Sequence, residues 1–424
     1  MVCCGDWPPS SPCSSVTPVS FGYGTMTDAF GRLRVSEPFT LFDSHQRYDL
    51  DDNFVSNTAS GGTVTFVGTQ SSANLMVTNT VGSYAARETK YVFNYQPGKS
   101  LLAMTTFVMA PQNDTNFRQR VGYFGSDNGY YLEYSDQLYI VERSNVTGTV
   151  SNTAVAQSAW NTRTLQGGTI TNPDFNLDVT KVQIFWIDME WLGAGTVRTG
   201  FVLNGQFIVT HIFNHANYSP TAYITTASLP VRYEIQSLTS NGPATSNLTQ
   251  ICSTVISEGG YDQPFRLFSN ITSFSKIMTA GTWYPVASFR LAPGRLDAVA
   301  QIRQVDISMI STDLLHWALW SNVTPADLTG ESFTAHLYSK NIQVDQSATA
   351  ITTTNCVQVA AGLVSGTNQS SAPVTFDLAK YYSQFARDSF AQESRIFTLA
   401  LYSVAGVGGG GASAQCLVSW NELI

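Results

Sequence analysis

Apolar and polar side chains alternate with a period of two through much of the chain, most clearly between residues 62 and 260. The segments 121–124 and 130–134 flank Asp127-Asn128-Gly129, a turn sequence that readily supplies a positive φ. The apolar segment 138–141 follows a few residues later. Strand patterns separated by turn signals about every ten residues are typical of a sandwich or barrel. This region therefore predicts consecutive antiparallel strands.

The segment 182–191 is apolar on both faces until its end, as expected of a central strand buried between two layers. The segments 197–203 and 207–213 come next, and Asn204-Gly205 between them is a strong hairpin signal. A long central strand followed by such a hairpin resembles the concanavalin-like jelly rolls, which include lectins and laminin-G domains. That resemblance covers residues 182–213 and implies an antiparallel β-sandwich.

A second series of strand patterns begins after Ser257-Glu258-Gly259-Gly260-Tyr261, which reads as a connection. It includes 283–291, 298–310 and 316–320. It ends with 396–404 and 414–420, which bracket a glycine-rich segment, 407–411, expected to be a flexible loop. Residues 374–388 are expected to hold a short helix, with Asp377 as its N-cap.

The fold class predicted from these patterns is all-β, with two antiparallel β-sandwich (jelly-roll-like) domains and an extended N-terminal arm. The expected boundaries are 1–26 for the arm, 27–260 for a concanavalin-like sandwich and 261–424 for a second sandwich. The first 20 residues are rich in Pro, Ser and Cys and lack periodicity, so we expect the arm to dock against another surface.

The six cysteines give no complete metal set. Cys3, Cys4 and Cys13 cluster in the arm, where free thiols, intersubunit disulfides and metal ligands are all open readings. Free thiols are favoured because no second pair of ligands or nearby histidine completes a zinc site. Cys252 and Cys416 lie in apolar segments and are expected to be buried.

Charged residues make up only 12% of the chain, and the formal net charge is -8. Without a run of lysine or arginine, the chain is not expected to bind nucleic acid.

No stretch of about 18 apolar residues exists, so we expect no membrane span. The first residues do not read as a signal peptide, which indicates synthesis in a cytoplasm. A surface of hydroxyls and amides suits packing against other proteins.

Three strings carry a second resemblance: DAFGRLRVS at 28–36, FNYQPGKS at 93–100 and ICSTVISEGG at 251–260. Together they resemble a family of poorly characterised virion-associated proteins of tailed bacteriophages, with relatives in large algal viruses. The resemblance spans about residues 21 to 265. It implies a component of a virus particle, without giving its position on the particle.

Asp188 and Glu190 are the strongest enzymatic candidates. On a strand, residues i and i+2 face the same way at about 6.5 to 7 Å between Cα atoms, from which two carboxylates can flank a glycosidic bond. The pattern resembles that of jelly-roll glucanases, whose motif is Glu-x-Asp-x-Glu, but Trp186 stands at the position of the nucleophile. We therefore expect no enzymatic activity and treat both carboxylates as structural.

Two patterns suggest metal binding only weakly. His211 and His215 are four residues apart, a spacing that brings side chains together on a helix but not on the expected strand. Asp49, Asp51, Asp52 and Asn53 are oxygen-rich, but they lack the glycine placement of a known calcium loop. We expect a solvated turn there, and no cofactor or metal in the protein.

Aromatic and arginine side chains suggest contact surfaces. Tyr130, Tyr131 and Tyr134 are candidates for stacking on a glycan, although alternate positions must point into the core. Candidates for oligomer or particle contacts are the three arm cysteines and the arginines of the first strands: Cys3, Cys4, Cys13, Arg32, Arg34 and Arg47.

The function expected from the sequence is that of a non-enzymatic structural protein on the exterior of a virion. The tail, baseplate or fibre apparatus is the leading position. Capsid decoration, as a cement or minor capsid protein, and a glycan-degrading hydrolase are the alternatives. The expected partners are other virion proteins, further copies of the chain in a homo-oligomer, here taken as a trimer, and a host surface glycan.

Overall fold

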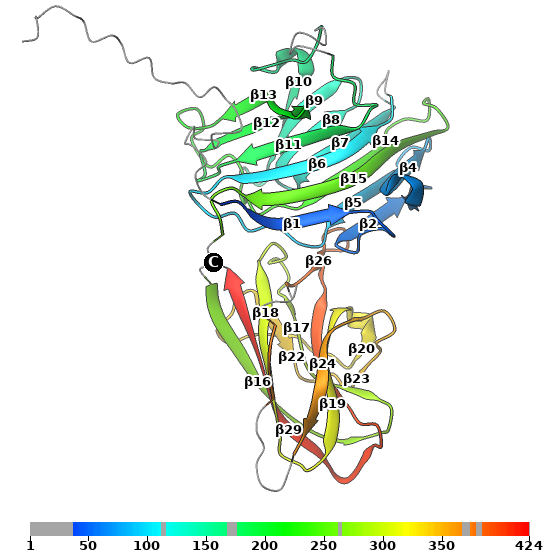
Figure 1. The fold of residues 1–424 in the computed structure, drawn as a ribbon, viewed down its shortest axis with the longest axis vertical. Helices are drawn as coiled ribbons and strands as arrows, with labels where there is room; N and C mark the ends of the chain where they lie inside the picture. Colours follow the sequence, from blue (N-terminus) through cyan, green and yellow to red (C-terminus); the bar gives the residue numbers. More distant parts are fainter. Residues whose placement is uncertain are drawn as a thin grey trace, which may run out of the picture.

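The computed structural model describes residues 37–111, 116–167, 176–261, 265–366, 374–378 and 384–423. The described chain is almost entirely β-strand, with three short 3-10 turns. Two pairs of sheets are stacked along the long axis of the molecule (Figure 1). The N-terminal arm, residues 1–26, lies outside the described residues. The 3-10 turns are η1 (Gly68–Gln70), η2 (Gln157–Ala159) and η3 (Pro325–Asp327).

The first pair of sheets contains the strands β1 to β15. Sheet 1 has eight strands, with β1 paired on β15 beside the main path. Its strands in spatial order are β13 (Gln206–Asn214), β12 (Thr196–Leu203), β11 (Gln183–Met189), β6 (Leu101–Met109), β15 (Thr245–Ser257), β4 (Ser72–Thr78) and β3 (Thr63–Val67), with β1 (Phe39–His45). Sheet 2 has seven: β10 (Ser151–Ala156), β9 (Leu138–Ser144), β8 (Gly129–Tyr134), β7 (Phe117–Phe124), β14 (Val231–Ser237), β5 (Tyr84–Thr89) and β2 (Phe54–Ala59).

The second pair contains the strands from β16 onward. Sheet 3 consists of β16 (Phe265–Met278), β29 (Val407–Leu423), β18 (Ala300–Met309) and β25 (Val374–Asp377). Sheet 4 consists of β21 (Thr334–Ala335), β22 (Ile342–Asp345), β17 (Trp283–Leu291), β28 (Ile396–Tyr402), β19 (Leu314–Val323) and β24 (Val357–Ser365). Two short pairs complete the fold: β20 (Leu328–Thr329) with β23 (Ala350–Ile351), and β26 (Arg387–Asp388) with β27 (Glu393–Ser394).

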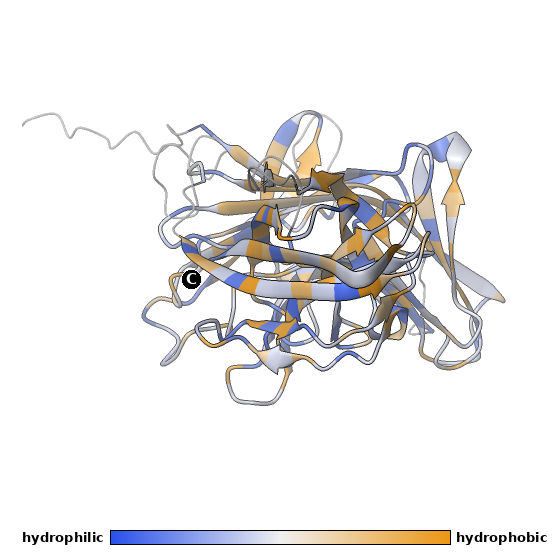
Figure 2. Cartoon of the chain, turned by 90° about the horizontal axis from the view of Figure 1, so that it is seen from below, coloured by the Kyte–Doolittle hydropathy of each residue, from blue (hydrophilic) through white to orange (hydrophobic). Residues whose placement is uncertain are grey.

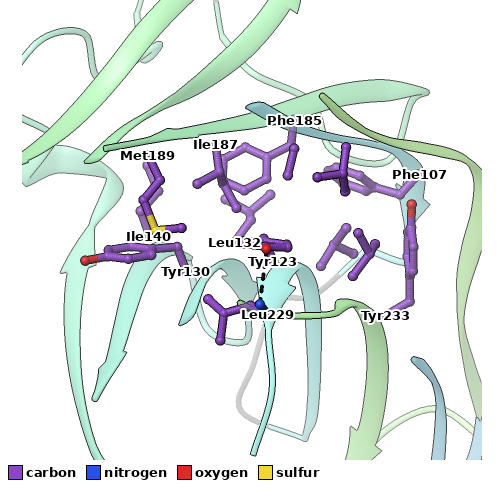
Figure 3. Close-up of a cluster of buried hydrophobic side chains, with 14 of the residues drawn as sticks. Phe107, Tyr123, Tyr130, Leu132, Ile140, Phe185, Ile187, Met189, Leu229 and Tyr233 are labelled. Atoms are coloured by element: carbon purple, nitrogen blue, oxygen red, sulfur yellow. Dashed lines mark hydrogen bonds between the residues drawn. The ribbon is translucent and has the colours of Figure 1, made fainter. Parts of the chain in front are cut away.

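Alternation of side chains builds both cores. Phe185, Ile187 and Met189 on β11 face Tyr130 and Leu132 on β8 across the space between sheets 1 and 2 (Figure 3). The second core forms in the same way between sheets 3 and 4. In Figure 2, apolar and polar residues succeed one another along single strands. Burial of apolar area is the main term that stabilises such layers.

The predicted all-β fold is confirmed, and so are its hairpins. β7 and β8 pair around the turn that ends at Gly129, which has φ 135°. β12 and β13 pair around Asn204 and Gly205, with φ of 52° and 72°. Both values lie in the left-handed region that a type I′ turn requires.

Two predicted elements are wrong. The helix expected over 374–388 is contradicted at both ends, because 374–377, which include Asp377, form β25, paired with β18, and 387–388 form β26; residues 379–383 lie outside the described residues. Phe376 packs edge-on against Trp317 at 5.4 Å between ring centroids. Residues 407–411 belong to the start of β29 and not to a loop, although the pairing with β16 is irregular here, passing from Ala412 opposite Lys276 to Val407 opposite Met278.

The two pairs of sheets meet through the segment around β26, which lies between them in Figure 1. The backbone N–H of Arg387 donates to the carbonyl of Lys90 at 2.8 Å. Its guanidinium donates to Glu88 on β5 at 3.0 Å. The expected boundary between residues 260 and 261 falls in the connection between β15 and β16.

Candidate functional site

Asp188 lies near the end of β11, on the face of sheet 1 that points away from the core, and Glu190 comes directly after the strand. Asp188 is fully buried and accepts hydrogen bonds from Arg198 on β12, through Nε at 3.2 Å and through Nη2, and from the hydroxyl of Ser100. β11 and β12 are paired so that Asp188 is directly opposite Arg198. Its charge is therefore compensated by a cross-strand partner.

Glu190 follows β11 directly and is also fully buried. Its backbone N–H donates to the carbonyl of Thr196 at 3.2 Å, which holds this end of the strand against β12. Burial raises the pKa of the Tyr95 hydroxyl, and the negative charge of Glu190 adds to this rise. The carboxylate thus lies in a protein-enclosed environment beside Tyr95.

Trp186 stands where the glucanase motif has its nucleophile, and it belongs to an apolar cluster on the same outer face. Its ring packs against Phe207 at 5.7 Å between centroids. The buried members of this cluster are Leu102, Trp186, Val209 and Ile212. At two positions where a retaining glycosidase of this motif has catalytic carboxylates, β11 therefore has a packed tryptophan, Trp186, and an ion-paired carboxylate, Asp188.

The tyrosines predicted to meet a glycan are mostly inside the protein. Tyr130 and Tyr131 are fully buried, so neither ring is open to a sugar, and this prediction is wrong for both. Tyr130 donates to Glu142 at 2.5 Å, and Tyr131 donates to Asn152 at 3.2 Å. Tyr134 is half-buried against the first core.

The outer face of sheet 2 carries a buried network of ion pairs. Glu234 on β14 accepts from Arg120 on β7 at 3.0 Å and from Arg232 at 2.7 Å. Glu88 on β5 accepts from Arg232 at 3.1 Å and from Arg387 at 3.0 Å. Burial by itself raises the pKa of Glu234, but the attraction of Arg232, Arg120 and two further arginines outweighs it and lowers the pKa to about 2. This network joins neighbouring strands and reaches the second pair of sheets.

The two histidines considered for metal binding have separate roles. His211 lies on β13, where burial lowers the pKa of its imidazole, and its Nδ1 accepts from the backbone N–H of Asn161 at 3.2 Å. His215 stacks on Tyr223 at 3.6 Å between centroids and contacts Glu142 at 2.6 Å. Among the described residues, no group of three or more His, Cys, Asp or Glu side chains is arranged to hold a metal ion.

The oxygen-rich loop after β1 makes hydrogen bonds to its own backbone. Asp51 accepts from the N–H of Asn53 at 2.9 Å, and Asp49 accepts from the N–H of Leu50 at 2.7 Å. The carbonyl of Asp51 accepts from Arg87 at 2.8 Å. This arrangement is an ordinary turn in which the side chains satisfy local donors.

Five of the six proposed contact residues, the arm cysteines Cys3, Cys4 and Cys13 and the arginines Arg32 and Arg34, lie outside the described residues. Arg47 is exposed, with its guanidinium over the ring of Tyr48 at 4.9 Å. Cys416 is buried as expected, but Cys252 is exposed and that prediction is wrong. A bulge in the pairing of β15 with β6, between Gln250 and Ser253, interrupts the alternation on which it depended.

A cleft of about 520 Å³ opens where the two pairs of sheets meet. Tyr95, Trp191 and the segment 225–228 line it from the first pair, and residues 294–299 with Asn341 line it from the second. Asp297 lines this cleft with 59% of its side chain exposed, and its carboxylate is 3.7 Å from the guanidinium of Arg387. Sequence reasoning missed this cleft because its residues come from separate segments whose proximity depends on how the two sandwiches pack. The aromatic Tyr95 and Trp191 were the available signal.

Comparisons with known proteins show similarity at the level of solved structures only. Models of known protein families give no match, and no curated protein sequence matches the chain. An endo-β-1,4-glucuronan lyase from the fungus Trichoderma reesei is 12% identical, with a TM-score of 0.32 over 51% of this chain and 95% of that one. A glycoside hydrolase family protein from Mycobacterium thermorestibile is 10% identical, with a TM-score of 0.35 over 51% and 99%.

The CBM2 module of an evolved Dit of Lactobacillus casei BL23 phage J-1 is 7% identical, with a TM-score of 0.34 over 53% of this chain and 99% of that one. These identities and TM-scores are too low to assign a family or an activity to the chain. Within the described ranges, no helix is long and apolar enough to cross a membrane.

Proposed function

We propose that the protein is a non-enzymatic structural subunit of a virus particle, positioned on its exterior in the tail, baseplate or fibre apparatus. The strings at 28–36, 93–100 and 251–260 support this, because they resemble virion-associated proteins of tailed phages. The pairing of Asp188 with Arg198 and Ser100 is the observation that carries the non-enzymatic part. A carboxylate held by a buried guanidinium is a poor general acid and is not free to attack a sugar.

The outer face of sheet 3 supports a role in assembly. On the edge strand β16, Leu267 and Ile271 each keep 66% of their surface exposed. Ile271 is directly opposite Leu417 on β29, so apolar side chains of neighbouring strands adjoin. Ser273, opposite Gln415, continues this surface with uncharged polar groups. Exposed apolar patches rimmed by polar groups are typical of protein contact surfaces.

The position on the particle is tested by a density map of the whole virion together with the copy number of the chain. We expect a few dozen copies or fewer, located on the tail. Hundreds of copies spread over the capsid lattice would instead establish the alternative of a decoration or cement protein. A purified chain that stays a lone monomer and binds no particle would contradict the proposal.

The hydrolase alternative has its own test. The purified protein is incubated with host polysaccharide, and the reducing ends released are measured beside the Asp188→Asn and Glu190→Gln variants. We expect no release above that of a heat-denatured sample. Release that either substitution abolishes would show that the chain is an enzyme.

A further inference from the structure

The cleft at the junction of the two sandwiches has the size of a small-molecule site. Its volume of about 520 Å³ lies within the range of ligand pockets, roughly 300 to 1,000 Å³. Both sandwiches contribute walls, and such junctions between units are frequent places for ligand binding.

One wall presents a positioned aromatic side chain. Trp191 is half-buried and meets Tyr95 edge-on, at 6.0 Å between ring centroids and 88° between ring planes. The Tyr95 hydroxyl accepts from the backbone N–H of Trp191 at 3.0 Å, so the two residues hold each other in place. The face of an aromatic ring packs well against the C–H groups of a sugar ring.

The remaining walls combine polar groups with the apolar residues Pro97, Ala227, Ala298, Val299 and Leu423, and they are almost without net charge. The hydroxyls of Thr226 and Ser228 line one side, and Asn341 lines the other with its amide anchored on Glu422 at 2.9 Å. Among the described residues that line the cleft, only Arg295 and Asp297 are charged, and their charges are opposite. A phosphate or polyanion would find no excess of positive charge here, whereas hydroxyl groups would find donors and acceptors.

We propose that this cleft binds a short, neutral saccharide, with Trp191 as the stacking surface and Asp297, Arg295 and Asn341 as hydrogen-bonding groups. A carboxylate and a guanidinium two residues apart can accept from and donate to neighbouring hydroxyls of one sugar ring. The inference does not depend on where the protein sits on a particle, because it follows from the cleft alone. Particle location and sugar binding are measured separately, so either can fail without the other.

The test begins with the full-length chain on an array of neutral and anionic glycans, followed by calorimetry with the best-bound neutral oligosaccharide. We expect Trp191→Ala to weaken binding at least tenfold and Asp297→Asn to weaken it severalfold. Tyr48→Ala removes an aromatic ring that is 80% exposed outside the cleft, so it should leave the affinity unchanged. Asp297→Asn keeps the size of the side chain and serves as the informative variant if Trp191→Ala does not fold.

Three outcomes would overturn the proposal. The first is that no neutral glycan of the array binds at millimolar concentration. The second is binding that Trp191→Ala and Asp297→Asn both leave unchanged, since the site would then lie elsewhere. The third is a clear preference for anionic glycans, which the balanced charge of the cleft does not explain.

Discussion

Sheets 2 and 3 each pack one face against a core, but their outer faces differ. One carries buried charged side chains, and the other carries exposed apolar side chains. The outer face of sheet 2 holds a buried network of charges. Its members are Arg118, Arg120, Arg143, Arg232 and Arg387 with Glu88, Glu133 and Glu234. The outer face of sheet 3 holds exposed Leu267 and Ile271 among serine and glutamine side chains.

This difference shows that alternation along a strand does not determine whether its outward-facing side chains are enclosed by the chain or exposed. In sheet 2 the charges are enclosed and compensate one another, and Arg387 extends them to the second sandwich. The ion pairs of this network all join residues of the same chain. In sheet 3 the exposed apolar side chains contribute little to the stability of the isolated chain, so their use is expected in contacts with another chain.

The largest effect is expected from removing a carboxylate of the charge network. Glu234→Ala removes two buried charged hydrogen bonds, one from Arg120 and one from Arg232, each worth about 1.5 to 3 kcal/mol. Each arginine keeps one other carboxylate, Glu133 or Glu88, and the free energy of unfolding of the first sandwich should fall by about 3 to 5 kcal/mol. Urea unfolding followed by fluorescence measures this. Gln236→Ala, on the same face of β14, is the matched control and should cost less than half as much. A change below about 1 kcal/mol in Glu234→Ala would show that the network does not hold sheet 2 together.

Acid titration should test the contribution of Glu234 to the charge network of sheet 2. The folded pKa of Glu234, about 2, lies below its ordinary value of 4.5, so its stabilisation is complete above pH 4.5 and is lost as the pH falls toward 2. The stability difference between the wild type and Glu234→Gln should shrink across that window, by up to about 3 kcal/mol. Thermal unfolding at a series of pH values provides the measurement. A difference that stays constant from pH 5 to 2.5 would contradict the assigned pKa.

The contact between the sandwiches should depend on Arg387. Arg387→Ala removes a buried charge-assisted hydrogen bond to Glu88, which is worth about 1.5 to 3 kcal/mol. Glu88 keeps Arg232 as a partner, so the first sandwich should remain folded. Calorimetry should then separate the unfolding of the two sandwiches into distinct transitions. Arg266→Ala, at an exposed position of β16, should leave the transitions as they are in the wild type.

The smallest effect on stability is expected on the outer face of sheet 3. Ile271→Lys should change the free energy of unfolding by no more than about 0.5 kcal/mol, because the side chain is 66% exposed. It should nevertheless weaken self-association or attachment to particles, measured by sedimentation and by co-purification with virions. Val146→Lys places the same charge on an exposed position of the first sandwich and should weaken neither. Equal behaviour of the two variants would remove sheet 3 from the contact surface.

Local sequence patterns were enough to predict the fold class, many of the strands and the tight turns. Period-two alternation specifies which side chains share a face, and Asn204-Gly205 can adopt its two positive φ values whatever surrounds it. These are local properties, so they can be read without knowing which strands become neighbours. The local patterns gave a wrong prediction at residue 374, where pairing with β18 forms a strand in place of the expected helix. They were also wrong at the glycine-rich segment 407–411, which begins β29.

Which side chains meet depends on the three-dimensional packing of the strands. The residue type alone does not distinguish Tyr130 and Tyr131 from surface tyrosines. Their burial follows from their place on an inner strand of sheet 2. Asp188 is opposite Arg198 because of the register of β11 with β12, and the cleft with Tyr95 and Trp191 arises from the packing of two sandwiches. Register and packing depend on interactions between residues far apart in the chain, which a pattern along one segment does not contain.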